Sequence, residues 1–374
     1  MNLLKKIFLK NFLFLLAFLP FNGLFALPVT LSENAKISVL TVGTADELHS
    51  LFGHTALRIN DATQGLDITY NFGMFNFHTP NFYLKFVKGD LEYQLAVEEF
   101  ADFMFHYQYV NRTVWEQELD LSPQQKQQVF SQLQAIYTSP DRNYIYKFID
   151  RNCTTKVVDV LNQVLEPKLS YKNPKQTTYR TVLYPYFKNN FYENLGISLI
   201  FGTKPDAVAT SLFLPLDLLT QLENHNQTKQ TLTLYQQRYN NVSVPWWNNI
   251  YTLLAFLIGL IFWNKNALNY SFLLLLGVLG IFFIWVGSYS YHSELLWNYN
   301  VLLCNPLLVV LVFFKLLKKH KMVTFLSSLI LLFLGIYIVY MFNKPHFLSV
   351  LPLVFTVMIL VIRYFRISNK VLKA

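Results

Sequence analysis

The stretch Asp150-Arg151-Asn152-Cys153-Thr154-Thr155 lies where an irregular polar segment gives way to a helical pattern. After it, apolar residues recur at the spacing of one helix face, at Val157, Val158, Leu161, Val164 and Leu165. Asn152 and the two threonines are suitable capping residues, which predicts Cys153 in or just before the first turn of a helix. Unpaired N–H groups and the positive end of the helix dipole favour a thiolate there. The stretch therefore predicts a nucleophilic cysteine.

The base that such a thiol needs is predicted at His54. This histidine opens residues 54–59, whose polar and apolar side chains alternate as in a strand. A second alternating run, residues 66–73, follows after a turn and carries Asn71 on its polar face. We therefore expect a hairpin whose two polar faces coincide, with Asn71 as the candidate that orients the imidazole.

The register expected for this hairpin pairs Ile59 with Leu66, Arg58 with Asp67, and His54 with Asn71. A shift by one residue would turn the two polar faces to opposite sides, so their agreement favours this register. Two interpretations of Arg58 stay open: a structural cross-strand ion pair or a substrate-binding residue.

The apolar content is concentrated at the two ends of a 374-residue chain that is 53% hydrophobic and 14% charged, which excludes a single soluble domain. Residues 1–26 combine lysines, an apolar run and a segment that ends at Ala26, which predicts a signal peptide or an uncleaved anchor. Residues 27–248 have the size of one exported domain.

Five membrane spans are predicted in residues 249–374, because five apolar segments approach the ~20 residues that a spanning helix requires. They lie at about 249–263, 269–287, 301–317, 323–341 and 347–364. Lysine and arginine follow the first, third and fifth segments, which places residues 27–248 outside the cytoplasm. The net charge of +9 thus marks orientation, and we expect no nucleic-acid partner.

Neither a metal nor another cofactor is expected, because His49, His54, His78 and His106 lack the spacing of a ligand set. Cys304 falls inside the third predicted span. The chain has two cysteines, so an alternative to a nucleophilic Cys153 is a disulfide with Cys304. A second alternative is an inert half-buried thiol.

Taken together, these motifs resemble a known group of thiol enzymes. A histidine that opens a strand, followed by Asn152-Cys153 opening a helix, is similar to the permuted NlpC/P60 and lecithin:retinol acyltransferase group. Residues 51–58, 70–73 and 152–155, together with Phe213-Leu214-Pro215 and the multi-span C-terminal half, resemble Lnb-type lipoprotein N-acyltransferases. The resemblance implies an α+β exported domain with a permuted papain-like fold, an all-α bundle of five transmembrane helices, and a catalytic dyad of His54 and Cys153.

The resemblance also implies an activity at the bacterial inner membrane, with the catalytic domain in the periplasm. An acyl chain would pass from a glycerophospholipid, through a thioester on Cys153, to the α-amine of a diacylglyceryl-cysteine apolipoprotein. Asn152 and His292 are further candidates for substrate binding; the loop 288–300 that carries His292 is alternatively a plain connector. Two other functions stay open: a membrane-anchored NlpC/P60-like peptidase or amidase acting on the cell wall, and a non-catalytic membrane scaffold.

Overall fold

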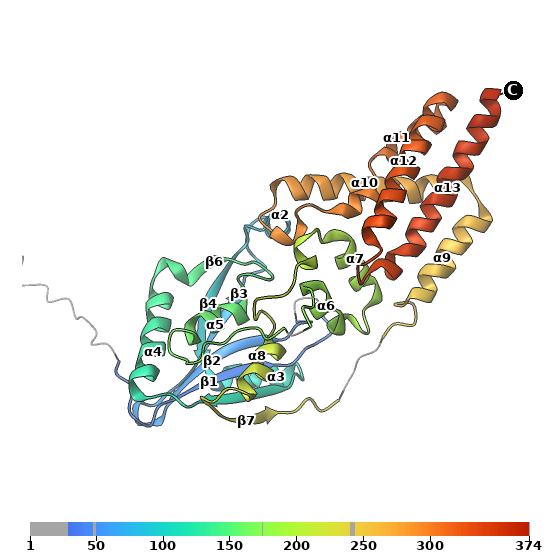
Figure 1. The fold of residues 1–374 in the computed structure, drawn as a ribbon. Coiled ribbons are helices and arrows are strands. Elements are labelled where there is room, and N and C mark those ends of the chain that lie inside the picture. Colours follow the sequence, from blue (N-terminus) through green and yellow to red (C-terminus); the bar gives the residue numbers. More distant parts are fainter. Residues whose placement is uncertain (1–28, 48–49, 174, 240–243, 374) are drawn as a thin grey trace, which may run out of the picture.

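The computed structural model describes residues 29–47, 50–173, 175–239 and 244–373. The predicted signal peptide or anchor, residues 1–26, lies outside the described residues. A sheet domain occupies one end of the molecule and a bundle of long helices the other (Figure 1).

An open antiparallel sheet of seven strands forms the N-terminal half of the described chain, in the order β6-β4-β3-β2-β1-β5-β7. The strands are β1 Lys36–Val42, β2 His54–Asp61, β3 Leu66–Met74, β4 Glu92–Glu99, β5 Val114–Leu119, β6 Asn143–Ile145 and β7 Thr228–Tyr235. This half contains both helices and strands, as predicted, whereas the finer assignment to a permuted papain-like fold stays a prediction.

The predicted hairpin of β2 and β3 forms, but its register differs from the expected one by two residues. Asp61 rather than Ile59 pairs with Leu66. The turn is shorter than expected, because only residues 62–65 connect the strands and Gly65 closes the turn at φ +64°. A shift of two residues leaves every side chain on its own face, so the faces were predicted correctly although the pairing was wrong.

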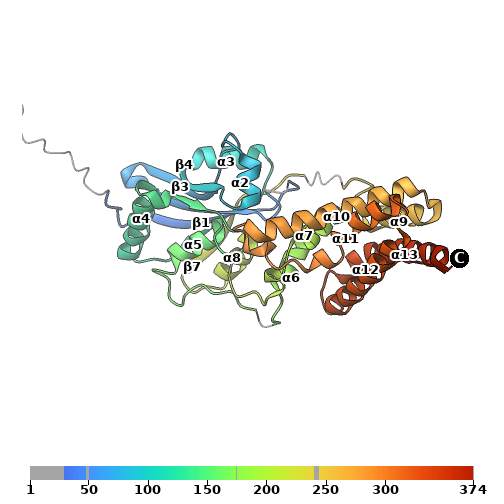
Figure 2. The same cartoon turned by 90° about the horizontal axis from the view of Figure 1, so that it is seen from above.

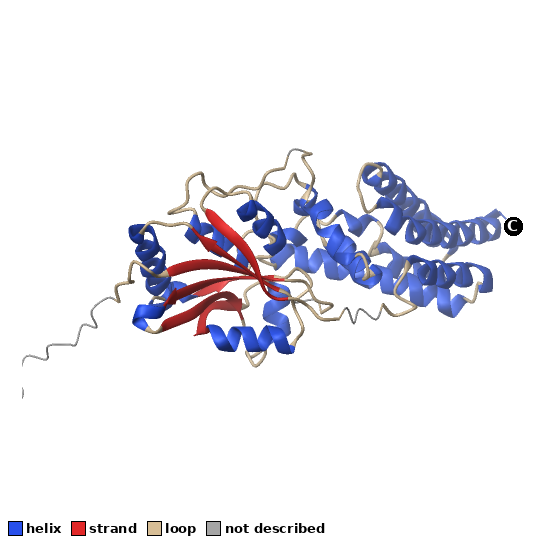
Figure 3. Ribbon diagram, turned by 90° about the horizontal axis from the view of Figure 1, so that it is seen from below, coloured by secondary structure: helices blue, strands red, loops and turns tan. Residues whose placement is uncertain are grey.

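Helices cover both faces of the sheet (Figure 3). On one face, α4 (Pro123–Thr138), α5 (Cys153–Leu161) and α8 (Pro215–Glu223) pack over a core that contains Leu57 and Tyr70. On the other face, α3 (Phe100–Tyr109) packs over Leu40, Ala56 and Val114. The alternation along β2 supplies both cores, because neighbouring side chains of a strand point to opposite faces.

The C-terminal half contains four candidate membrane spans in the described residues, not the five predicted. They are α10 (Asn266–Tyr289), the segment Ser293–Leu316, α12 (His320–Met341) and α13 (Phe347–Lys373). The first predicted span is instead the helix α9 (Ile250–Trp263), which ends where Asn264 takes a left-handed conformation. Its 14 residues rise only about 21 Å, which is less than the ~30 Å of a bilayer core.

The second candidate span is irregular over its first half. Two 3-10 turns, Ser293–Leu295 and Tyr299–Leu302, precede the α-helix α11 (Leu307–Leu316). The side chains of Asn298 and Asn300 donate hydrogen bonds to carbonyl groups at the end of α7 (Phe191–Ile200). These carbonyls have no partner within their own helix, so the asparagines dock α7 onto the bundle.

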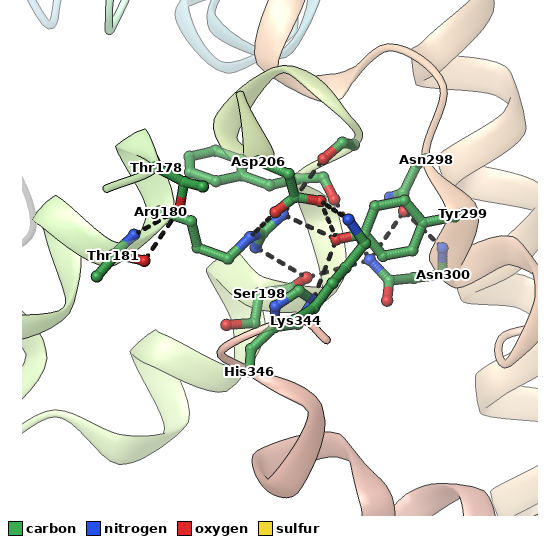
Figure 4. A network of polar contacts seen from close by, with 12 residues as sticks. Thr178, Arg180, Thr181, Ser198, Asp206, Asn298, Tyr299, Asn300, Lys344 and His346 are labelled. Carbon is green, nitrogen blue, oxygen red and sulfur yellow. Dashed lines mark hydrogen bonds and ion pairs between the residues drawn. The ribbon is translucent and has the colours of Figure 1, made fainter. Parts of the chain in front are cut away.

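A buried ion-pair network joins the sheet domain to the helical bundle (Figure 4). The carboxylate of Asp206 binds Arg180 at 2.6 Å and Lys344 at 2.8 Å, and it accepts a hydrogen bond of 2.7 Å from Tyr299. Burial raises the pKa of Asp206, but Arg180 and the other donors lower it more, so the pKa lies below its usual value. Lys344 precedes α13 and Arg180 belongs to α6 (Tyr179–Leu183), so one carboxylate connects both halves.

Candidate active site

Cys153 is the first residue of α5, as predicted, and its position is fixed by a capping box. Asn152 Oδ1 accepts a hydrogen bond from the Thr155 N–H, and Thr155 Oγ1 accepts one from the Asn152 N–H. The Asn152 amide group also donates to the carbonyls of Phe148 and Phe213. The predicted capping role of Asn152 is therefore confirmed, while its contact with a substrate stays a prediction.

The structure brings His54 and Cys153 together, although 98 residues lie between them in the sequence. The imidazole of His54 lies close enough to the Cys153 thiol to lower the pKa of that thiol. One residue further on each element, Thr55 Oγ1 and Thr154 Oγ1 lie 3.1 Å apart and tie the start of β2 to the start of α5. Two element ends thus meet at the thiol.

Gly73 lies directly beside Cys153. Gly73 on β3 has φ +88°, and a Cβ at this position would stand 3.5 Å from the Cβ of Cys153. A side chain at this position would therefore be strained by the positive φ, and its Cβ would be in contact with Cys153.

Asn71 lies behind His54 and is itself oriented by Glu98. Asn71 Oδ1 is 3.1 Å from His54 Nε2, and Asn71 Nδ2 donates a hydrogen bond of 2.7 Å to Glu98 Oε1. Because the amide nitrogen faces the carboxylate, the amide oxygen faces the ring, and His54 Nε2 must carry the hydrogen. This tautomer leaves Nδ1 as the basic nitrogen for Cys153.

The polar groups around Cys153 favour its thiolate. Burial, the largest effect, raises the pKa of the thiol, but the hydrogen bond and charge of His54 lower it, as do the Thr55 N–H and the Thr154 hydroxyl. The net result is a pKa below the ordinary value of a cysteine. The arrangement is therefore suited to nucleophilic chemistry, with Cys153 as the candidate nucleophile, His54 as the candidate base and Asn71 as the candidate orienting group.

Glu98 and Tyr107 are site residues that the sequence analysis missed. The ring of Tyr107 on α3 stacks on His54 with 6.3 Å between centroids. Glu98 sits on β4, where it pairs with Thr69 and shares a face with Asn71. The alternation along β4 (Glu92–Glu99) places Glu98 on the face of Gln94 and Ala96, and this pattern could have indicated it. No sequence signal pointed to Tyr107.

Arg58 and His292, two further predicted site residues, lie apart from the thiol. Arg58 makes a bidentate ion pair with Asp67 at 2.7 Å and a second one with Glu116 at 3.0 Å. The structural interpretation of Arg58 is therefore confirmed, and its substrate contact stays a prediction. His292 Nε2 donates to the carbonyl of Phe86 at 2.8 Å, which places it against another helix, α2 (Phe82–Lys88).

The segment 288–300, which includes the irregular start of the second candidate span, reaches the backbone before Cys153 through a different residue, Glu294. This buried carboxylate accepts a hydrogen bond of 3.2 Å from the N–H of Ile149. Lys204 forms an ion pair with Asp150 and donates to Ser293 at 2.8 Å. This segment thus holds the backbone that leads into α5.

The structure excludes a disulfide between the two cysteines. Cys153 and Cys304 are both free, and Cys304 is buried in the helical bundle. In the part of the chain that the structure describes, no group of three or more His, Cys, Asp or Glu side chains could hold a metal ion.

Residues 30–184 match the model of the Lnb N-terminal periplasmic domain. The match covers His54, Asn71, Glu98 and Cys153, and it confirms the resemblance that the sequence motifs predicted. Comparisons with curated proteins and with solved structures give no match. The periplasmic domain family and the four apolar helices indicate a multi-pass inner-membrane protein with a periplasmic domain.

Proposed function

Because residues 30–184 match the model of the Lnb N-terminal periplasmic domain, we propose that this protein is a thiol-dependent lipoprotein N-acyltransferase. The acyl donor is a membrane glycerophospholipid, and the acceptor is the α-amine of a diacylglyceryl-cysteine apolipoprotein. The observation that carries the proposal is the meeting of His54, at the start of β2, with Cys153, at the first turn of α5, which the Thr55–Thr154 contact fixes and Asn71 supports from behind.

The first half-reaction acylates Cys153. His54 Nδ1 takes the thiol proton, and the thiolate attacks an ester carbonyl of the phospholipid. The C–O bond of the ester then breaks, the leaving alkoxide takes the proton back from His54, and a lysophospholipid departs. The acyl chain remains on Cys153 as a thioester.

The second half-reaction transfers the chain to nitrogen. The neutral α-amine of the apolipoprotein attacks the thioester carbonyl, and an amine proton passes to His54. The C–S bond breaks, the proton returns to the sulfur, and an amide forms. A thioester suits this step because it reacts with amines more readily than an oxygen ester does.

Both half-reactions pass through a tetrahedral oxyanion. Backbone N–H groups at the first turn of α5 are suited to stabilise it, since the positive end of a helix dipole lies there. The membrane part of the protein contributes differently. Both substrates are anchored by acyl chains, so an enzyme fixed in the same bilayer meets them at high local concentration.

Incubation of the purified protein with phospholipid labelled in its acyl chain tests the proposal. We expect a label on Cys153 that neutral hydroxylamine removes and that added apolipoprotein discharges into an N-acylated product, detected by mass spectrometry. Cys153→Ser and His54→Ala should each abolish the label while membrane insertion is kept. If both variants still N-acylate the apolipoprotein, the assignment of these residues is wrong.

The same experiment separates the other functions. Cleavage of peptidoglycan without acyl labelling would favour a cell-wall peptidase or amidase. Neither activity would favour a non-catalytic scaffold.

A further inference from the structure

The short helix α2 exposes a row of large apolar side chains. Tyr83 is 78% exposed and Leu84 is 66% exposed, and Phe86 and the preceding Phe77 are also exposed. None of the seven residues of α2 (Phe82–Lys88) is fully buried. A contiguous apolar surface of this kind is unfavourable in water and indicates a contact with another apolar phase.

The position of α2 shows which phase that is. The hydroxyl of Ser290, directly after the end of α10, donates to the carbonyl of Val87 at 3.0 Å, and the Tyr291 N–H donates to that of Lys88 at 2.7 Å. Both views place α2 beside this end of α10 (Figures 1 and 2). A helix that is fastened to the end of a candidate membrane span lies at the level of the bilayer surface.

The neighbours of α2 have the composition of a membrane interface. The segment 288–300 exposes Tyr291 and Trp297, the latter at 81%. Lys88 lies over the Tyr291 ring, 5.5 Å from its centroid, and Lys85 belongs to the same helix. Aromatic rings and basic side chains are enriched at the headgroup level, where the rings enter the apolar region and the cations meet lipid phosphates. This combination fits a lipid bilayer as the occupant.

A chain of aromatic rings leads from α2 toward Cys153. Successive ring centroids are 4.4 to 6.5 Å apart, in the order Phe86, Phe82, Phe75, Tyr93 and Tyr146. Cys153 packs against the same hydrophobic cluster as the last four rings of this chain. The charge of Cys153 also contributes, after burial, to raising the pKa of Tyr146.

We propose that α2 is immersed in the outer leaflet of the bilayer, and that its aromatic row guides an acyl chain of the donor lipid to Cys153. The immersion of α2 stands independently of the enzymatic activity. The guiding role rests on the proposed function.

Immersion is tested with a fluorescent label on α2 in lipid vesicles. Leu84→Cys is made in a background with Cys153→Ser and Cys304→Ala, labelled with a polarity-sensitive dye, and reconstituted with phospholipids that carry a nitroxide on the acyl chain. We expect the nitroxide lipids to quench the fluorescence of the label on residue 84, and aqueous iodide not to quench it. The matched control is Phe105→Cys, a residue of α3 that is 72% exposed. Helix α3 lies on the side of the sheet domain away from α10 (Figure 1). The label on residue 105 should respond to iodide alone.

Equal responses at residues 84 and 105 would overturn the immersion of α2. This measurement needs no enzymatic turnover, so its outcome is separate from that of the proposed function.

The guiding role is tested by Leu84→Asp, with Phe105→Asp as the control. Since burial of a leucine side chain is strongly favourable, we expect the aspartate to slow acylation of Cys153 from phospholipid vesicles by at least about tenfold. Acylation from a water-soluble short-chain thioester should be unchanged, and Phe105→Asp should be unchanged with both donors. Equal loss with both donors would contradict a role in guiding lipid. Absence of acylation in the unmodified protein would instead remove the proposed function and leave the quenching result standing.

Discussion

The orientation of the Asn71 amide determines which nitrogen of His54 carries the hydrogen. Glu98 accepts from the amide nitrogen, so the amide oxygen is left to accept from His54 Nε2. An imidazole with its hydrogen on Nε2 presents a lone pair on Nδ1, which is the form needed to take a proton from Cys153. Each side chain in this row thus fixes the state of the next.

The pH dependence of the Cys153 thiol should report its contact with His54. Burial raises the pKa of Cys153, and His54 contributes the largest opposing effect, so that the net pKa is lowered. A lowered pKa means that the thiolate appears at lower pH than in an ordinary thiol. His54→Ala should therefore move the midpoint of Cys153 alkylation by a small haloacetamide upward, measured as rate against pH.

The control for this profile is His292→Ala, since His292 lies against α2. A midpoint that does not move in His54→Ala would show that the imidazole does not stabilise the thiolate.

At the scale of elements, the site depends on how α5 meets β2 and the loop before it. The first residue of α5 reaches the first residue of β2, and the pair Thr55–Thr154 fixes this contact. The preceding backbone is held by Glu294, which comes from the 3-10 turn Ser293–Leu295 in the membrane part. The segment before Cys153 therefore depends on a residue that lies 145 positions after Ile149 in the chain.

Removing the Glu294 contact should loosen this segment. Glu294→Ala leaves the buried N–H of Ile149 without its partner, which costs about 1–3 kcal/mol. We expect a lower thermal unfolding midpoint and slower acylation of Cys153. Glu294→Gln keeps an accepting oxygen and should restore both properties to near those of the unmodified protein. Equal damage from both variants would show that the negative charge matters rather than the hydrogen bond.

At the scale of the molecule, the buried carboxylate of Asp206 holds the sheet domain and the bundle together. It is shared by Arg180 from one half and Lys344 from the other, and Tyr299 completes its hydrogen bonds (Figure 4). Beside it, burial followed by the charge of Arg180 lowers the pKa of His346 to about 3, so this histidine adds no cation at neutral pH.

Loss of Asp206 should be far more damaging than loss of an exposed carboxylate. Asp206→Ala leaves the buried guanidinium of Arg180 unpaired, which costs about 3–5 kcal/mol. Glu118→Ala is the matched control, because Glu118 also pairs with two cations, Lys36 and Lys229, but does so at the surface, where ion pairs contribute about 0–1 kcal/mol. Thermal unfolding should show a large shift for Asp206→Ala alone. Similar shifts for both variants would contradict the role of the network.

The sequence by itself determined the local elements around the site. Capping residues and helical spacing place Cys153 at the start of α5, and alternation places His54 and Asn71 on one face of a hairpin. These patterns can be recognised in the sequence because they depend on residues that are close together in the chain. Alternation has a period of two, so it identifies the two faces of a strand but cannot distinguish registers that differ by two residues. For this reason the predicted pairing of β2 with β3 was wrong by two residues.

Only the tertiary structure decided the contacts between distant segments. Three contacts of the site arise from the packing of elements that are far apart in sequence. They join Glu98 to Asn71, Tyr107 to His54, and Glu294 to the backbone before Cys153. Hydropathy also overestimated the number of spans, because apolar content does not reveal that Asn264 ends α9 after 14 residues. Local patterns encode which element forms and which face it buries, whereas the partner of that face is chosen by the packing of the whole chain.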